Sequence, residues 1–298
     1  MQNYLDYSKE RHSKGTYKEK ITVFKNFGKF LKNRGYDIRF EEISIISKGM
    51  CFEYLQKQYI KRSGYSANRD RKNLAAAYSW GVKYYDFESN NPFLAIEKFP
   101  EIKQDKYIPP IKDFWSIYNA CTDKQDKLML LTFLYTAGRR NEIFRLTWDD
   151  INFENDSIIL KTKKREQSNF ENDSIPLMPE LKINLLDWQE KQPIKTKYIF
   201  TCLTKNQKGK NHKDYGKPFV SRQKFLSRLC KTLNIKPFGY HSIRHLTATI
   251  LYKNGAKLYD IQAILRHKSA ATTQKYLHKL GLSDLKDEMI KYMPKLEN

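Results

Sequence analysis

The chain of 298 residues has only four cysteines and no long apolar run. The cysteines show neither a C-x-x-C pair nor another metal-binding spacing, so we predict reduced thiols, as in an intracellular protein, and no bound metal. No stretch approaches the roughly 20 apolar residues of a membrane span, and the N-terminus does not resemble a signal peptide. We therefore expect a cytoplasmic protein without a membrane partner, associated with the nucleoid if its host is bacterial.

Acidic residues are also in deficit. The chain has 55 Lys and Arg residues against 33 Asp and Glu residues, which leaves a formal net charge of +22. Residues 1–105 hold 20 basic and 13 acidic residues, and the remainder holds 35 and 20, so both halves are basic. This excess is larger than solubility requires and favours DNA contact by both halves, with a generally lysine-rich proteome as the alternative explanation.

Residues 1–97 carry helical patterns almost throughout. Apolar residues recur at three- and four-residue spacing over 17–31, and Gly35 then ends that helix. A second helix is predicted over about 48–61, and a third is expected to be capped by Ser66. These patterns indicate a helical domain. A basic group within it is predicted to contact DNA, the alternative being an ordinary solvated face: Lys61, Arg62, Arg69, Arg71 and Lys72.

Residues 98–110 are predicted to form a linker, because Pro109 and Pro110 and a mixed-charge stretch separate two helical patterns. A hinge at this place would let the two halves close around a duplex. The second half, residues 111–283, mixes helical patterns with one strand pair. The expected fold class is therefore mainly α with a small β-hairpin or sheet. Residues 284–298 show helical spacing again and form a C-terminal tail.

An arginine follows a break in the most apolar helical pattern of the second half. The helix predicted over 127–135 ends at Ala137-Gly138, directly before Arg139. Glu142 lies three residues later. One interpretation places Arg139 in a cleft with Glu142 holding it, and the other makes the two an exposed i,i+3 ion pair.

A strand pair is predicted at 157–160 and 173–177, on either side of a basic, polar segment. The heptapeptide N-F-E-N-D-S-I occurs twice, at 152–158 and at 169–175. Each copy is expected to supply a polar turn that leads into a strand. A short duplication that lengthened the hairpin and a chance match both remain open.

The most informative stretch runs from His241 to Tyr276. His241 and Arg244 lie three residues apart, so one helix would present both in its first turn, where free N–H groups and the helix dipole favour a phosphate. A second helix is predicted to end near His267, and a third, short one carries Tyr276. His241 and His245 have i,i+4 spacing, but the lack of a glutamate between them and the nearby Arg244 argue against a zinc pair.

Three segments of the second half resemble, in this order, the motifs of the tyrosine recombinases (the phage integrase family): T-A-G-R-R-N-E-I-F-R-L-T-W-D-D-I, H-S-I-R-H-L-T-A-T with I-Q-A-I-L-R-H-K-S, and T-T-Q-K-Y. The resemblance implies a small helical, SAM-like core-binding domain followed by an α+β catalytic domain. It also implies a two-domain, Xer-like member without a separate arm-binding domain. The tail at 284–298 would then dock on a neighbouring protomer, the alternative being its own domain.

The resemblance further implies the roles of the site residues. Two arginines would bind the phosphate, a tyrosine would attack it, and a lysine of the hairpin would protonate the leaving oxygen. Lys161 lies in a K-T dipeptide like that of many members, whereas Lys163 fits the separation from the first arginine better and is preferred. One departure is Arg266, which stands where a glycine is common. The implied catalytic set is Arg139, Lys163 or Lys161, His241, Arg244, His267 and Tyr276, supported by Glu142.

These roles imply a site-specific recombinase that cuts and rejoins duplex DNA through a 3′-phosphotyrosyl intermediate, without metal or cofactor. We expect a homotetramer on two paired sites, with accessory DNA-bending or directionality factors as candidate partners. Two alternatives remain open. One is a type IB topoisomerase-like relaxing enzyme, and the other is a DNA-binding excision or regulatory factor that has lost catalysis.

Overall fold

The computed structural model describes five stretches of the chain: 2–36, 45–102, 107–163, 170–204 and 212–269. The chain divides into two compact units, residues 1–105 and 106–298, and this division falls within the predicted linker. The expectations for Tyr276 and for the tail lie outside the described residues. Of Lys163, only the backbone is described.

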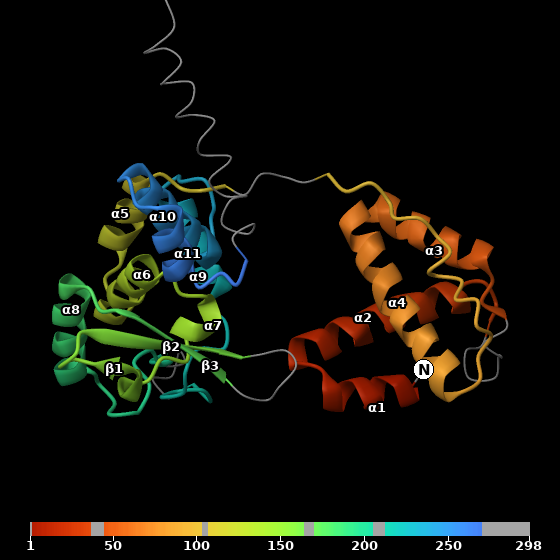
Figure 1. The fold of residues 1–298 in the computed structure, drawn as a ribbon, viewed down its shortest axis with the longest axis horizontal. Helices are drawn as coiled ribbons and strands as arrows, with labels where there is room; N and C mark the ends of the chain where they lie inside the picture. The colour runs from red at the N-terminus through yellow and green to blue at the C-terminus, as the bar shows by residue number, and fades with distance from the viewer. Residues whose placement is uncertain (1, 37–44, 103–106, 164–169, 205–211, 270–298) are drawn as a thin grey trace, which may run out of the picture. The chain divides into compact units, whose positions relative to one another are not determined.

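The described part of the first unit is helical, as predicted. Three of its helices begin at a serine whose hydroxyl accepts a backbone N–H from three residues further on. The third predicted helix begins one turn earlier than expected, because Ser66 donates its N–H to Ser63 and Ser63 is therefore the cap. The four helices are α1 (Gln2–Arg11), α2 (Lys14–Lys32), α3 (Lys48–Lys61) and α4 (Gly64–Tyr84) (Figure 1).

Aromatic rings fill the core of the first unit. The Phe27 ring meets Tyr54 edge-on at 5.0 Å between centroids and Phe93 at 5.6 Å. Phe93 belongs to the segment after α4, which Arg71 ties to that helix by donating hydrogen bonds to the carbonyls of Leu94 (3.0 Å) and Ile96 (2.7 Å). The segment that leads into the predicted linker is therefore packed on the first unit.

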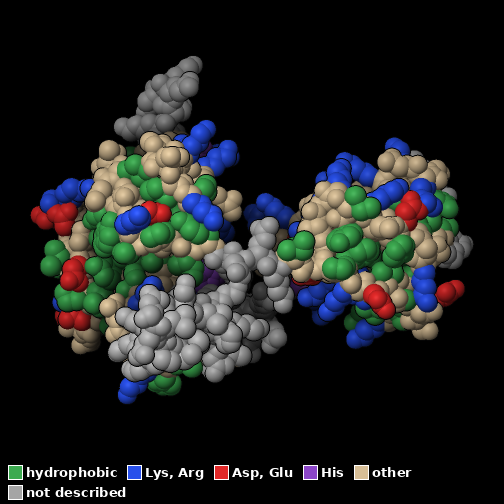
Figure 2. Space-filling view, turned by 90° about the horizontal axis from the view of Figure 1, so that it is seen from above, with side chains coloured by type: hydrophobic (Ala, Val, Ile, Leu, Met, Phe, Trp, Pro, Cys, Tyr) green, Lys and Arg blue, Asp and Glu red, His purple; other side chains and the backbone are tan. Residues whose placement is uncertain are grey.

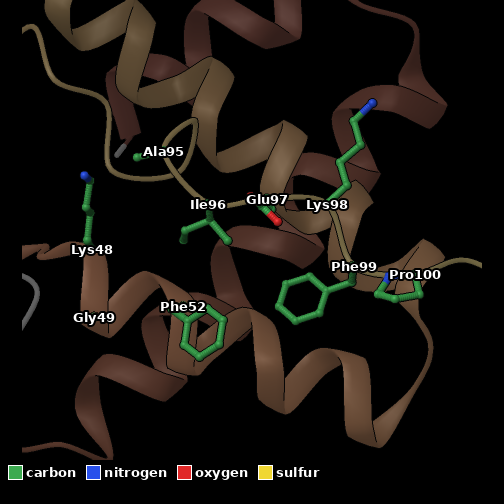
Figure 3. Close-up of a pocket in the computed structure, with 9 residues that line it drawn as sticks. All are labelled: Lys48, Gly49, Phe52, Ala95, Ile96, Glu97, Lys98, Phe99 and Pro100. Atoms are coloured by element: carbon green, nitrogen blue, oxygen red, sulfur yellow. The ribbon is translucent and has the colours of Figure 1, made fainter.

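A hollow of about 560 Å³ lies between the start of α3 and residues 95–100 (Figure 3). The rings of Phe52 and Phe99 line it and stack with 6.2 Å between centroids. Asn68 on α4 fixes the wall, because its side chain accepts the N–H of Phe99 (2.9 Å) and donates to the carbonyl of Phe99 (2.8 Å). Helix α4 therefore holds Phe99 through Asn68, and it holds Leu94 and Ile96 through Arg71.

The second unit packs helices against a small antiparallel sheet, which confirms the predicted fold class. The sheet has the order β1-β2-β3, and in the described part of the chain no helix is long and apolar enough to cross a membrane. The strands are β1 (Ile151–Asn152), β2 (Ser157–Lys163) and β3 (Phe170–Pro176). The helices are α5 (Ile111–Ala120), α6 (Lys124–Thr136), α7 (Arg140–Ile143), the 3₁₀ turn η2 (Trp148–Asp150), α8 (Pro179–Lys191), α9 (Gln223–Thr232), α10 (Tyr240–Lys253) and α11 (Leu258–Leu265) (Figure 1).

Helix α6 lies at the centre of the second unit, packed against both α8 and α10. Its residues from 128 to 134 are all buried, which explains why it is apolar all round rather than striped. Thr132 and Thr136 are also buried, and their hydroxyls donate to the helix carbonyls of Leu128 (2.8 Å) and Thr132 (2.5 Å). This buried helix ends at the break before Arg139 and so brings that residue to the edge of the core.

The two copies of the repeated heptapeptide adopt different structures. The first forms the expected turn, because the Asn152 side chain accepts the N–H groups of Glu154 and Asn155 before the chain enters β2. The second is strand from residue 170 onward, so the expected turn is wrong for the described part of this copy. The register pairs Ile158 with Ile175, and both are buried. Burial of Ile175 and the pairing of β3 with β2 therefore make the second copy a strand, although its sequence is the same as that of the first copy.

Candidate active site

Arg139 lies between the end of α6 and the start of α7. Ala137 adopts a left-handed conformation (φ 48°) and ends α6, and Arg139 is the N-cap of the next helix. Glu142 accepts hydrogen bonds from the Arg139 backbone N–H at Oε2 (2.8 Å) and from its Nη1 at Oε1 (2.9 Å). The Glu142 side chain is only 4% exposed, whereas that of Arg139 is 40% exposed. The carboxylate is thus a buried anchor for a guanidinium that solvent or a ligand can reach.

Strand β2 contributes a residue to this anchor that sequence reasoning missed. Thr162 donates its hydroxyl to Glu142 Oε1 at 2.6 Å, and Arg139 Nη1 lies 3.4 Å from the same hydroxyl. Thr162 belongs to the K-T dipeptide that drew attention only for its lysine. Side chains alternate along a strand, so Thr162 and Lys161 face opposite sides of β2.

Arg244 on α10 is buried where the ends of two other helices meet. It donates from Nη1 to the carbonyl of Ala137 (2.6 Å) and from Nη2 to the carbonyl of Leu265. One turn further along α10, Thr247 donates to the carbonyl of Leu134 at 2.7 Å. These bonds tie the predicted phosphate-binding turn of α10 to the break before Arg139 and to the end of α11.

The end of α11 places His267 within the field of both predicted arginines. Burial is the largest cause that lowers the pKa of His267, followed by the charges of Arg244, Arg139, Arg266 and His241 in that order, and together they bring it to about 4. The imidazole is therefore neutral at pH 7. Its electrostatic neighbours come from α7, α10 and α11, so these elements present one positively charged region.

The two histidines of α10 lie side by side. The ring of His241 is 4.4 Å from that of His245, which is 3% exposed, whereas His241 is exposed. Within the described residues no group of three or more His, Cys, Asp or Glu side chains has the geometry to hold a metal ion. His241 thus lies on the surface of the same turn that carries the buried Arg244.

The two candidate lysines of the hairpin, Lys161 and Lys163, both lie on β2. Lys161 forms an ion pair with Asp150, whose side chain is 3% exposed. Lys163 pairs through its backbone with Phe170 in the β2–β3 ladder. The structure therefore brings Arg139, Glu142, Arg244, His267 and His241 into one region of the second unit, and it gives Lys161 a carboxylate partner.

The five residues of the first unit that are predicted to contact DNA have different surroundings. Lys61, Arg62 and Lys72 are exposed. Arg62 and Arg69 also approach Asp70, which is fully buried, at 3.4 and 3.3 Å. Arg71 instead holds the backbone after α4. Figure 2 shows lysine and arginine side chains on the visible face of both units, with acidic side chains among them.

Comparison with known proteins identifies relatives along the whole chain. The model of the phage integrase family matches residues 110–281. The tyrosine recombinase XerC of Lacticaseibacillus casei (strain BL23) is 27% identical over 309 residues, covering 99% of this chain and 97% of that protein. The tyrosine recombinase XerA of Saccharolobus solfataricus is 32% identical over 179 residues, covering 59% of this chain and 53% of that protein.

Solved structures show the same fold at lower sequence identity. A lambda integrase (75–356) dimer bound to a COC′ core site superposes with a TM-score of 0.70 at 17% identity, covering 92% of this chain and 93% of that one. The Tn1549 transposon integrase in complex with transposon right end DNA gives a TM-score of 0.61 at 18% identity, covering 91% and 99%. These likenesses extend over both units.

Proposed function

The chain belongs to the phage integrase family, and from that premise we propose that it is a site-specific recombinase that cuts and rejoins duplex DNA. Its relationship to tyrosine recombinases over almost the whole chain supports this function. The observation that carries the proposal is the position of Arg244, which bonds to the carbonyl of Ala137, two residues before Arg139. Two guanidinium groups from distant parts of the sequence thus lie at the same interruption between helices α6 and α7.

The chemistry follows from the charges. A phosphodiester resists attack because it is anionic, and arginine is the best side chain to bind its non-bridging oxygens, being permanently charged and a planar donor. Arg139 and Arg244 would stabilise the five-coordinate phosphorus, as oxyanion-hole donors stabilise other anionic transition states. His267, neutral because its pKa is about 4, would donate a hydrogen bond without adding charge.

Tyr276 is the proposed nucleophile, and it needs assistance because the pKa of a phenol is about 10. His241 would take the phenolic proton as the oxygen attacks phosphorus. The bond to the 5′ oxygen breaks, and Lys163 would protonate that oxygen, since Lys161 is paired with Asp150. The products are a 3′-phosphotyrosyl link and a free 5′ hydroxyl. A 5′ hydroxyl of a second strand reverses the step, so no metal, cofactor or external energy source is required.

Strand exchange needs paired sites, so the proposed active form is a homotetramer on two duplexes, in the cytoplasm. The tail at 284–298 would dock on the neighbouring protomer, and accessory DNA-bending or directionality factors would set the outcome. In the first unit, Lys61, Arg62, Lys72 and Arg69 are the proposed phosphate contacts. Arg71 is a weaker candidate, because its guanidinium already donates to two carbonyls.

A nicked suicide substrate tests the proposal. Full-length protein is incubated with a nicked duplex that the protein has selected from a random pool, and covalent complexes are resolved on SDS gels. Wild type is expected to form an adduct, and Tyr276→Phe is expected to form none. Tyr259→Phe is the matched control, because Tyr259 is 78% exposed on α11 and is expected to react as wild type does.

Three outcomes would contradict the proposal in different ways. An adduct with Tyr276→Phe would reject the nucleophile. Relaxation of supercoiled DNA by monomers without recombinant products would favour the topoisomerase-like alternative. Binding without any adduct in the wild type would favour a DNA-binding factor that has lost catalysis.

A further inference from the structure

Arg266 has an unusual backbone and an unusually buried charge. It caps α11 in a left-handed conformation (φ 51°), which favours glycine over residues with a side chain. Its side chain is nevertheless only 4% exposed. A buried guanidinium is costly unless it is paired and hydrogen-bonded. The surroundings of Arg266 are therefore expected to explain why an arginine occupies this position.

In the described part of the chain, the Arg266 guanidinium contacts three groups. Nη2 donates to Glu142 Oε2 at 2.7 Å, and Nη1 donates to the carbonyl of Thr136 at 3.3 Å. Nε lies 3.6 Å from Asp173 Oδ2, at ion-pair distance but without a hydrogen bond. Asp173 comes from the second copy of the repeated heptapeptide, on β3. The residue before His267 is thus connected to α6, α7 and β3 at once.

The carboxylate that Arg266 contacts is the one that holds Arg139. Oε2 of Glu142 accepts from Arg266 and from the Arg139 backbone, and Oε1 accepts from Arg139 Nη1 and from Thr162. One buried anion is therefore shared by two cations. Because Arg266 is 4% exposed and Arg139 is 40% exposed, only Arg139 presents its charge toward solvent.

We propose that Arg266 is a positioning residue for DNA cleavage: it balances the charge of Glu142, so that Glu142 orients the Arg139 guanidinium without neutralising it toward the phosphate. This inference rests on the proposed function and adds a residue to its site. Among the described residues, removal of Arg266 leaves Arg139 as the only guanidinium that donates to Glu142, and the charge of Arg139 is drawn into that pair. A phosphate at the exposed side of Arg139 then meets a weaker field.

The pH dependence of Glu142 gives a measurable consequence. Burial would raise the pKa of Glu142, but the charge of Arg266, followed by the hydrogen bonds from Thr162 and Arg139, holds it below its ordinary value. Among the described residues, Asp173 on β3 lies 3.6 Å from Arg266 Nε, Arg244 on α10 donates to the carbonyl of Ala137, and His267 after α11 lies in the field of Arg139, Arg244 and Arg266. Without Arg266, burial is less opposed, so the pKa of Glu142 is expected to rise.

The main test compares Arg266→Gly with Arg266→Lys in the full-length protein. Glycine suits the left-handed backbone but removes the charge, whereas lysine keeps the charge. The single-turnover rate of adduct formation is expected to fall about 10- to 100-fold in Arg266→Gly, the range for misplacing a catalytic group by up to about 1 Å. DNA affinity is expected to change less than twofold, and Arg266→Lys is expected to recover part of the rate. The acid limb of the rate profile is expected to move to higher pH in the glycine variant.

Asn234→Gly is the matched backbone control. Asn234 is also left-handed (φ 53°) and follows α9, outside the site. It is expected to cleave at the wild-type rate with an unchanged pH profile. A wild-type rate and profile in Arg266→Gly would overturn the inference, as would a lysine variant as impaired as the glycine variant.

A DNA-free titration separates this inference from the proposed function. Carboxyl ¹³C NMR of Glu142 is recorded against pH in the wild type and in Arg266→Gly, and the midpoint is expected to rise in the variant. An unchanged midpoint would overturn the coupling between Arg266 and Glu142 whatever the cleavage result. A wild-type protein that forms no adduct while the midpoint shifts would reject the proposed recombinase, and the coupling would stand.

Discussion

Replacement of Glu142 by glutamine tests the central contact of the site. The amide has the same shape as the carboxylate but no charge, and it offers only one acceptor oxygen. Its NH₂ group would face donors, either Arg266 and the Arg139 backbone or Thr162 and Arg139 Nη1. Arg266, which is 4% exposed, would at the same time lose its closest counter-charge.

The expected loss of stability is large for a single-atom change. Removing one partner of a buried ion pair typically costs about 3–5 kcal/mol. Asp173, 3.6 Å from Arg266 and one-third exposed, offsets part of this loss, so we expect the lower end, about 3 kcal/mol. In a unit of this size, each kcal/mol lowers Tm by about 2–4 °C, so the expected drop is roughly 6–12 °C.

The difference between the two proteins depends on pH with a definite sign. The pKa of Glu142 is lowered in the folded state, so its ionised form stabilises the fold fully above the unfolded pKa of about 4.3. That contribution is lost as the pH falls through the lower, folded pKa. The glutamine variant has no such titration, so the gap in stability is expected to be widest near neutral pH and to shrink in acid.

Urea unfolding at a series of pH values, without DNA, measures this gap. Glu154→Gln is the control, because Glu154 is exposed in the turn before β2 and its change is expected to stay within about 0.5 kcal/mol. A Glu142→Gln protein as stable as the control at neutral pH would refute the reasoning. So would a deficit of the same size at every pH, since the charge of the carboxylate would then have no role.

Three further outcomes follow from contacts around the site and in the first unit. Thr162→Val removes a 2.6 Å hydrogen bond to the buried carboxylate and is expected to cost about 1.5–3 kcal/mol in urea unfolding, whereas Thr132→Val removes only a hydroxyl bond to a helix carbonyl and is expected to cost less. Lys72→Ala is expected to reduce the slope of log K against log salt for DNA binding by about 1, as loss of one phosphate contact does. Arg71→Ala is expected to leave that slope unchanged and to lower the stability of the first unit, because Arg71 binds two carbonyls. A larger change in the slope with Arg71→Ala than with Lys72→Ala would contradict these roles.

Helices were the most predictable part of the fold, for a local reason. The apolar spacing over 17–31 reports one buried face, and the structure has α2 there. The cap of α4 was misassigned because Ser63 and Ser66 are both good N-cap residues within one turn, and only the direction of their hydrogen bond distinguishes them. The repeat failed as a predictor because its second copy pairs with β2 along a ladder that short-range composition does not reveal.

Spacing and residue type are local properties, so the amino-acid sequence was sufficient to predict the family motifs, the helical periodicity and the interruption before Arg139. The pairing of charges could be seen only in the folded chain, because Arg266, Arg71 and Thr162 contact groups that are distant in the sequence. In the sequence, Arg266 stands out only because a glycine is common at its position, yet its guanidinium is buried against Glu142. Burial and pairing depend on which elements pack together, and no pattern within one element carries that information.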